Sequence, residues 1–561
     1  MLIRTYADIE KLEGKDALSD AEWALIENCK LGEPTVLGDG KLPDGPNSER
    51  NIRAGLLRYL ILGGCERCQM REQGVLLSGA QIVGKLDISF ARTVGGVVLN
   101  HCAFDMPIAA SQAHLDRLEL SGCRLLGMNA ESVMVRGDMC FDQVKCDGIL
   151  SISGGEIGGQ LVVVGAELNG SEGQAFIAQG VLVRGGVFLE NLKSIGEVSF
   201  AGAEISVQFS AEEAEFNGGD GLSLNAQSAT IKGGTFLKHV KSTGEISFMG
   251  AEIDFQLSFE GADLNGGKGR AFNGQGMVVA GGLFWRDLSA VVGLIHLNTA
   301  QLGDLVDDKE SWGKVSLLSL IGLTYGNMIS PMDLTFRKRW LKLGSTYKGQ
   351  FYPQPYQQLA KFYRETGHRY EAREILVAKE IEQRKATREA IREGKVRTES
   401  WLHPKVLTAL NFLWDSATRL IAGYGYKPWL SLWWLGGMVV TIMFCAQLTW
   451  NAGDFAPNSP VVLTSTDWKT IADGPSENPA ADWTDTLAPG KDYETFYSFA
   501  YALDVVVPVL DLGQTDAWAP SPARGDWGYW MFYLQKIFIV LGWVVTAIAA
   551  AAISGMIRRD D

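Results

Sequence analysis

Proline is scarce in this chain of 561 residues, which has 17 prolines against 65 glycines. Glycine-rich flexible chains usually contain much proline as well, and collagen needs a strict three-residue glycine period that this sequence lacks. Hydrophobic residues make up 46% of the chain and charged residues 21%, which excludes wholesale disorder. The sequence is therefore that of a multi-domain globular or membrane protein with one glycine-rich, proline-poor part.

The motifs of common enzyme classes are also missing. The six histidines are scattered, and there is no Walker loop, no His-Glu-x-x-His zinc motif and no Gly-x-Ser-x-Gly elbow. The net charge of −14 argues against a protein built mainly to hold nucleic acid. We therefore expect a protein that is not an enzyme, uses no cofactor and does not bind nucleic acid directly.

The eight cysteines offer one spaced pair, Cys65 and Cys68. A structural zinc site needs four ligands, usually from two such pairs, and His101 and Cys102 would have to supply the rest although adjacent residues rarely both ligate one ion. A redox dithiol would need a thioredoxin-like context, which is missing. Buried or incidental thiols are the favoured interpretation, and a metal site at Cys65 and Cys68 is the alternative.

The glycines concentrate in residues 73–308, which hold 38 of them and a single proline, Pro107. The twenty residues from Gly186 recur from Gly234 with 13 identical positions, at an offset of 48. Apolar and polar residues alternate within each copy, which predicts strands, and a fixed period of this length is typical of solenoids and propellers. Corners that need positive φ would come from the Asn-Gly and Gly-Gly pairs at 169–170, 217–219 and 265–267.

A short tripeptide recurs eleven residues apart, as at 203–205 and 214–216, with the pattern Ala-Glu/Asp-Ile/Leu/Phe. This pattern resembles the Ala-Asp/Asn-Leu/Phe core of pentapeptide-repeat-like β-solenoids, diluted to two coils in each copy of the repeat. The resemblance implies a mainly β fold, a right-handed solenoid of about ten coils, which at ~4.8 Å per coil would be roughly 50 Å long. A β-propeller is the alternative, but the Trp-Asp-like signatures of propeller blades are absent.

Residues 401–561 have a different character, with 12 of the 16 tryptophans and two uncharged apolar stretches, 429–448 and 537–556. Each stretch has the ~20 residues that a membrane-spanning helix needs. Two buried core helices are the alternative interpretation. Tryptophans that would anchor the ends of the two spans at the membrane interfaces are Trp429, Trp433, Trp434, Trp450, Trp527 and Trp530.

The charges flanking these stretches predict an orientation. The loop 451–528 has three basic and twelve acidic residues, whereas Arg558 and Arg559 follow the second stretch. The positive-inside rule then places both termini in the cytoplasm of a bacterium and the acidic loop outside its inner membrane. No signal peptide is expected at the N-terminus. The chain also resembles bacterial proteins labelled membrane-associated oxidoreductases, although no residue supports a flavin, nicotinamide or haem site.

We therefore predict four parts: an N-terminal helical cap at 1–72, the β-solenoid at 73–308, an α-helical linker at 309–400 and a two-helix transmembrane domain at 401–561. The linker contains one helical hairpin that resembles a tetratricopeptide repeat. An amphipathic helix at 401–421 is expected to lie along the inner membrane surface before the first span.

The outer loop contains a further apolar segment, 494–512, which is interrupted by Asp504 and is too short to span a bilayer. Its layout is that of a re-entrant segment, and the order of helix, apolar half-helix, glycine-containing turn and helix resembles two-helix cation channels. The potassium-filter sequence TVGYG is missing. If several chains assemble, acidic rings could form around the turn at Gly513 from Asp504, Asp511 and Asp516. The alternative is an amphipathic outer helix packed on the hairpin.

Three functions fit these features. The first is a cytoplasmic sensor or scaffold coupled to a homo-oligomeric, channel-like membrane domain. The second is a passive scaffold that is held in the lipid bilayer and presents its solenoid to an unknown cytoplasmic protein or ligand. The third is an acidic DNA mimic, because residues 73–308 carry 27 acidic and 14 basic residues.

Overall fold

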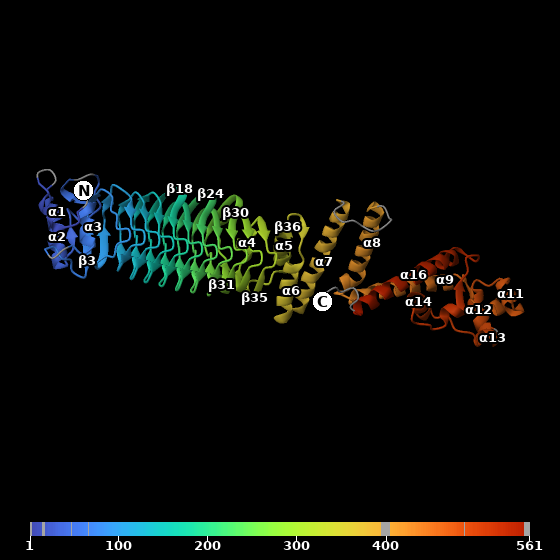
Figure 1. Ribbon diagram of the computed structural model, residues 1–561. Coiled ribbons are helices and arrows are strands. Elements are labelled where there is room, and N and C mark those ends of the chain that lie inside the picture. Colours follow the sequence, from blue (N-terminus) through green and yellow to red (C-terminus); the bar gives the residue numbers. More distant parts are fainter. Residues whose placement is uncertain are drawn as a thin grey trace. The chain divides into compact units, whose positions relative to one another are not determined.

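The computed structural model describes residues 3–13, 17–45, 48–64, 67–393, 404–486 and 488–554. The chain divides into two compact units, residues 1–375 and 376–561. Most of the first unit is a parallel β-solenoid of about 12 turns between residues 74 and 329, in which successive coils stack on one another (Figure 1). The predicted fold class, a β-solenoid followed by helices, is confirmed.

Two long parallel sheets form the walls of the solenoid. The strands of the first sheet are β1 Thr35–Val36, β3 Gly74–Ser78, β5 Gly96–Asn100, β8 His114–Leu115, β9 Leu118–Glu119, β12 Met134–Val135, β13 Met139–Cys140, β16 Glu156–Ile157, β17 Leu161–Val162, β19 Leu182–Val183, β20 Val187–Phe188, β22 Glu204–Ile205, β23 Phe209–Ser210, β25 Thr230–Ile231, β26 Thr235–Phe236, β28 Glu252–Ile253, β29 Leu257–Ser258, β31 Val278–Trp285, β33 Gln301–Asp307 and β35 Thr324–Ile329. The strands of the second sheet are β2 Asn51–Arg53, β4 Gln81–Val83, β6 Ala103–Phe104, β7 Ile108–Ala109, β10 Arg124–Leu125, β11 Met128–Asn129, β14 Lys145–Asp147, β15 Leu150–Ser151, β18 Glu167–Ile177, β21 Lys193–Ser199, β24 Glu215–Asn225, β27 Lys241–Ser247, β30 Asp263–Asn273, β32 Ala290–His296 and β34 Leu317–Ser319.

The interior of the solenoid is filled by the alternating apolar residues of the repeat. The recurring tripeptides place their first and third residues inside, so that Ala203, Ile205, Ala214 and Phe216 are all buried. The Phe200 ring contacts the ring of Phe176 in the preceding coil and the ring of Phe209 in its own coil. The period of two therefore gives each coil one buried face, and burial of that face is the main stabilising term.

Each copy of the repeat consists of two coils of unequal length. The shorter coil runs from Lys193 to its pairing partner Glu215, and the longer coil runs from Glu215 to its partner Lys241. The extra residues of the longer coil form a bulge at 218–221, where the register of β24 shifts against β27. Equivalent shifts occur at 170–173 in β18 and 266–269 in β30, so every second coil carries a glycine-rich protrusion.

Each protrusion presses on the backbone of the next coil, and a glycine there gives it room. Gly244 has φ +108°, and a Cβ atom at this position would lie 2.7 Å from the carbonyl oxygen of Gly221 in the preceding protrusion. Gly196 and Gly293 have the same conformation and face the protrusions before them. A φ above +100° combined with so close an approach to backbone leaves no room for a side chain, which explains the glycine that recurs in this place.

Strands on both sides of residues 73–308 pair with the sheets of the solenoid. At the N-terminal end β1 and β2 already pair with β3 and β4, and they lie among the helices α1 Tyr6–Glu10, α2 Asp20–Leu31, η2 Ser48–Arg50 and α3 Ala54–Ile61. At the C-terminal end β34 and β35 carry the two sheets past residue 308 to Ile329. The remaining elements of this unit are α4 Lys309–Gly313, α5 Leu334–Gly344, β36 Thr346–Tyr347, β37 Gln350–Phe351, α6 Gln354–Glu365 and the first part of α7 Arg369–Arg392.

Helices α5 and α6 close the C-terminal end of the solenoid by pairing with its last coil. The amide of Leu320 donates to the carbonyl oxygen of Gly344 at 2.8 Å, and the Gln354 side chain bonds to the backbone of 322–323. Helix α5 is also held by an ion pair without solvent exposure, in which Arg337 donates to both carboxylate oxygens of Asp307 at 2.6 and 2.8 Å. No further coil follows the last one. The Gly344 carbonyl and the Gln354 side chain therefore bond to backbone groups of the last coil that would otherwise be unpaired.

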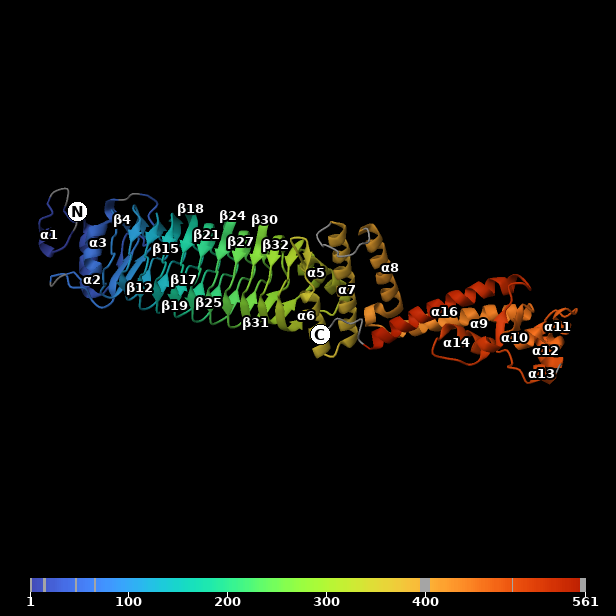
Figure 2. The ribbon, with the colours of Figure 1, turned by 45° about the vertical axis from the view of Figure 1, so that its right-hand side comes forward.

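The second unit is helical. Its helices are the second part of α7, α8 Pro404–Ala422, η3 Gly423–Gly425, α9 Trp429–Asn451, α10 Pro460–Thr464, α11 Thr466–Ala472, α12 Pro479–Thr486, α13 Ala488–Lys491, α14 Ser498–Val506, α15 Gln514–Ala517 and α16 Asp526–Ile553. The short strands β38 Phe455–Pro457 and β39 Trp518–Pro520 pair antiparallel. In both ribbon views α14 lies beside the pair formed by α9 and α16 (Figures 1 and 2).

The contact between protrusion and glycine predicts the effect of substitution. Gly244→Ala should destabilise the protein by roughly 2 kcal/mol or more, because it adds both a left-handed residue with a side chain and an overlap with backbone. Gly202→Ala is the matched control, since Gly202 also has positive φ but a Cβ there meets no atom within 4 Å. Its cost should be only about 1 kcal/mol. Thermal unfolding of the detergent-solubilised protein measures both, and equal shifts would contradict the steric role of Gly244.

Candidate functional site

Helices α9 and α16 are long and apolar enough, by length and composition, to cross a membrane. Helix α9 covers the stretch predicted at 429–448, and α16 covers residues 537–553 of the stretch predicted at 537–556 but begins well before it, at Asp526. Both helices leave most of their apolar surface exposed, which a soluble core helix would bury. Large exposed side chains on these two helices include Leu432, Val440, Phe444, Ile537, Val540 and Trp543.

Helix α14 runs from one end of this helix pair to its middle. Just before α14, the Phe496 ring stacks on Trp450, next to the last residue of α9, with ring centres 4.3 Å apart. At the other end of α14, the Val506 carbonyl lies so close to Gly542 that a Cβ atom there would overlap it. Gly542 is near the middle of α16, so α14 descends along the pair rather than lying across its end.

After α14 the chain returns to the end from which it came. The Trp518 ring lies 5.0 Å from Trp450, and β39, which begins at Trp518, pairs with β38. The segment 496–518 therefore enters and leaves at the same end of the helix pair and turns at about half its depth. Tyr501, Ala502 and Val505 of α14 belong to one buried apolar core with residues of α9 and α16.

Two polar side chains fasten the returning backbone to the entering helix. Asp504 accepts hydrogen bonds from the amides of Leu512 at 2.6 Å, Gln514 at 2.8 Å and Thr515 at 3.3 Å. The buried Gln514 side chain accepts from the amide of Tyr497 and donates to the carbonyl oxygen of Thr495. Asp504 thus caps the short α15, and its carboxylate is occupied within its own chain.

The other residues predicted to line a pore lie on the returning segment. Asp511 accepts a hydrogen bond from the amide of Gly513, which has φ +77° and precedes α15. Asp516 is exposed in the first turn of α15. The carboxylates of Asp511 and Asp516 are therefore the more accessible ones, whereas that of Asp504 holds the segment together.

Between these fastenings lies a stretch of unpaired backbone. Within the described part of the chain, no donor reaches the carbonyl oxygens of residues 508–512, and the amides of Val509 and Asp511 reach no acceptor. Pro508 has no amide hydrogen. The side chains of residues 509–512 are exposed and mostly apolar, and Val509 is 81% exposed. A row of free carbonyl oxygens at this depth is the most unusual feature of the second unit.

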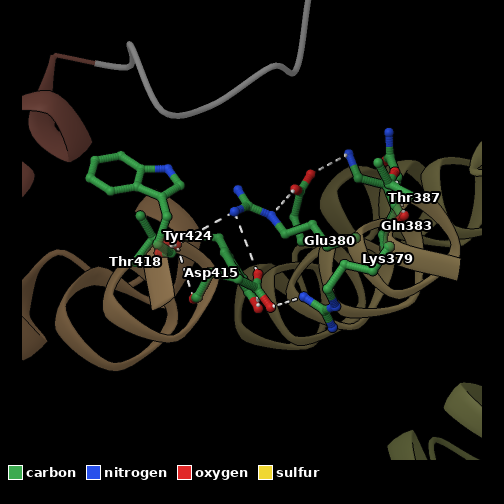
Figure 3. A network of polar contacts seen from close by, with 10 residues as sticks. Lys379, Glu380, Gln383, Thr387, Asp415, Thr418 and Tyr424 are labelled. Atoms are coloured by element: carbon green, nitrogen blue, oxygen red, sulfur yellow. Dashed lines mark hydrogen bonds and ion pairs between the residues drawn. The ribbon is translucent and has the colours of Figure 1, made fainter. Parts of the chain in front are cut away.

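A second polar cluster joins α7 to α8 (Figure 3). Arg388 donates to Asp415 at 2.6 Å, Arg384 lies 3.5 Å from the other carboxylate oxygen, and Tyr424 donates its hydroxyl to that oxygen at 3.0 Å. Burial, together with this hydrogen bond to Asp415, raises the pKa of Tyr424 to about 12, so the hydroxyl stays protonated. No motif in the sequence connects these partners, which come from three different elements.

The predicted interface tryptophans are mostly exposed. Trp433 is 78% and Trp530 69% exposed, and Trp429, Trp434 and Trp527 are exposed as well. Trp450 differs, because it packs between Phe496 and Trp518 and so positions the segment described above. Arg558 and Arg559 lie outside the described residues.

The predicted metal pair is only partly described. Cys65 lies outside the described residues, and Cys68 is buried with its sulfur 3.5 Å from the Tyr59 hydroxyl. Among the side chains that the structure describes, no three metal-ligating groups come together. Burial raises the pKa of the Cys29 thiol to about 12, and Cys68 adds to this shift, so Cys29 is a thiol and not a thiolate at neutral pH.

The solenoid carries an open groove of about 860 Å³ along its second sheet. Two columns of residues from successive coils line it. The first column alternates in charge over most of its length and contains Arg124, Lys145, Glu167, Lys193, Glu215, Lys241 and Asp263. The second is mostly polar and uncharged and contains Asp147, Asn169, Ile195, Asn217, Thr243 and Asn265.

Comparisons with protein-family models, with curated proteins and with solved structures give no match for this chain. A β-solenoid joined to two helices that are able to cross a membrane is consistent with a membrane-tethered scaffold. The geometry of the second unit and of the groove bears on the function in more detail.

The fastening by Asp504 can be tested by substitution. Asp504→Ala removes three hydrogen bonds to backbone amides and should destabilise the second unit by about 1–3 kcal/mol. Asp516→Ala removes the same charge from an exposed position on the nearby α15 and should change stability little. Thermal unfolding followed by tryptophan fluorescence reports on this tryptophan-rich unit. The same melting temperature for both variants would contradict the role of Asp504.

Proposed function

We propose that this protein is a membrane-tethered β-solenoid whose second unit assembles from several copies into a cation-conducting pore. The observation that carries the proposal is the row of unpaired carbonyl oxygens at 508–512, held halfway along α9 and α16. The segment that bears it begins and ends at one end of the helix pair, as a re-entrant segment does.

The hydrocarbon core of a membrane has no water to bond with unpaired backbone groups. In the hydrocarbon core an unpaired backbone group costs several kcal/mol, and non-helical backbone is tolerated there only against protein or a water-filled cavity. A single copy leaves residues 509–512 exposed, so a single copy would place them against lipid. Copies arranged around an axis, each turning this segment inward, would put the carbonyl oxygens into water instead.

The charge of the segment and its surroundings favours cations. Carbonyl oxygens are the negative ends of the peptide dipoles and can replace the hydration shell of a cation. The accessible carboxylates of Asp511 and Asp516 belong to the same returning segment, and the loop 451–528 has twelve acidic residues against three basic ones. An anion would meet repulsion along this whole path.

The proposed pore also gives the solenoid a role. The solenoid would be the cytoplasmic sensing or scaffolding domain, since positive charge flanks α9 and α16 on the side of the chain termini. The bilayer concerned would be the inner membrane of a bacterium. No catalytic step is part of the proposal.

Cation flux through reconstituted vesicles tests the pore. The purified protein should run as an oligomer in native mass measurements and should release trapped K⁺ or Na⁺. Leu510→Lys places a positive charge among the carbonyl oxygens and should reduce the flux on the order of a hundredfold. Val461→Lys is the control, because Val461 is an exposed apolar residue on α10 and is not part of the returning segment. A monomer without flux would overturn the proposal.

The groove on the solenoid favours a second function, that of a passive scaffold. Its alternating charges could bind an extended partner that carries charges of alternating sign, at the spacing of successive coils. Lys145 and Lys241 already pair with glutamates, at 3.1 and 3.0 Å. Lys193 has no ion pair within 4 Å in the described residues, so its charge is available to a partner.

Co-purification separates the two functions. If the groove binds a partner, Lys193→Glu should remove that partner from the full-length protein, whereas Lys268→Glu, an exposed lysine on a protrusion outside the groove, should retain it. The cation flux of both variants should be unchanged if the pore does not depend on the partner. Retention of the same proteins by both variants would exclude the groove as the binding surface.

A further inference from the structure

Helix α8 buries polar side chains and exposes apolar ones, the reverse of a surface helix in a soluble protein. Its buried side carries Asp415 and Thr418, which are 8% and 1% exposed. Its outward side carries Phe412, Leu413 and Leu420, which are 57%, 64% and 58% exposed. A helix in water buries its apolar stripe and exposes its carboxylate, so the outward side of α8 is not adapted to water.

The buried polar side of α8 is matched by α7. Figure 3 shows Asp415 and Thr418 turned toward the side chains of α7, with Tyr424 from η3 completing the cluster. The guanidinium of Arg384 also lies over the Tyr424 ring, 4.5 Å from its centre. These charge-assisted bonds neutralise Asp415 and explain how a carboxylate can be buried on this side.

The exposed surface of α7 on either side of the cluster is polar. Its exposed residues there are Gln383, Lys385, Thr387 and Glu389. The helix pair therefore exposes polar side chains on α7 and apolar side chains on α8, with the polar cluster between the two helices. A change from aqueous to apolar surroundings across one helix pair is what a helix at a membrane boundary experiences.

The position of α8 agrees with this arrangement. Only η3 and a few residues separate it from α9, and Ala422 at its end packs with Ile548 and Ala552 near the end of α16. The Trp434 indole of α9 donates to the carbonyl oxygen of Leu420 at 3.0 Å. Helix α8 is inclined to the pair α9 and α16 instead of continuing along it (Figures 1 and 2).

We infer that the outward side of α8, defined by Phe412, Leu413, Trp414 and Leu420, lies in the boundary between the headgroups and the hydrocarbon of a lipid bilayer. The surface is continuous with the exposed apolar sides of α9 and α16, and Trp414 and Arg419 can reach the headgroup level. The inference requires that α9 and α16 cross the bilayer, but it does not require a pore.

Photocrosslinking to lipid tests this contact in the full-length protein. p-Benzoylphenylalanine replaces Leu413 or Leu420, one exposed apolar side chain by another, and the protein is reconstituted into vesicles of alkyne-tagged phosphatidylethanolamine and phosphatidylglycerol. On irradiation both positions should take up tagged lipid, on the order of tenfold more than the same residue at Glu389, one of the exposed polar positions of α7. The unchanged melting temperature of each variant confirms that it is folded.

A positive control separates the possible failures. The same probe at Val540, which is 62% exposed on α16, should take up lipid as well. Lipid uptake at Val540 but not at positions 413 and 420 overturns the inference, as does a covalent dimer formed at either position, which would show that a second copy covers α8. No uptake at Val540 would show that α16 does not contact lipid and would remove the premise.

Discussion

The need to pair every backbone amide and carbonyl governs both units. In the solenoid each coil donates to the next along two parallel sheets, and the coil that comes last is closed by Gly344 of α5 and Gln354 of α6. Proline cannot take part in such donation, so its near absence from 73–308 follows from the same requirement. The stacking also fixes which side chains become neighbours, and this produces the ion pairs Lys145–Glu167 and Lys241–Glu215 along one face.

Some features of the repeat could be predicted from its sequence, and others could not. The alternation of apolar residues predicted the strands, and the 48-residue period with the recurring tripeptide predicted the solenoid. The division of each repeat into a shorter and a longer coil depends on where a bulge interrupts the strand, as at 218–221. The pairing of β34 and β35 with β32 and β33 continues the two sheets to Ile329, beyond the last recognised copy of the repeat.

In the second unit the helices could be predicted from the sequence, but the polar contacts that hold the chain together could not. Length and apolar composition predicted α9 and α16, and the interruption of an apolar segment by Asp504 marked the place where α14 lies. The role of Asp504 was not predictable, because its partners are amides of the returning segment that approach only when the chain turns. The bonds of Asp415 to Arg384 and Arg388 are hidden for the same reason, since they join two helices across residues that no pattern connects.

The two units answer the same requirement in different ways. At the end of the solenoid, a helix from the same chain satisfies the last coil, and the buried pair of Asp307 and Arg337 holds that helix in place. The carbonyl oxygens of 508–512 have no such partner in the described chain, although Asp504 and Gln514 fix the backbone on both sides. A stretch that is held firmly and left unpaired differs from a loop that is merely loose. No group of the described chain bonds to these carbonyl oxygens, which leaves them to water, an ion or another copy.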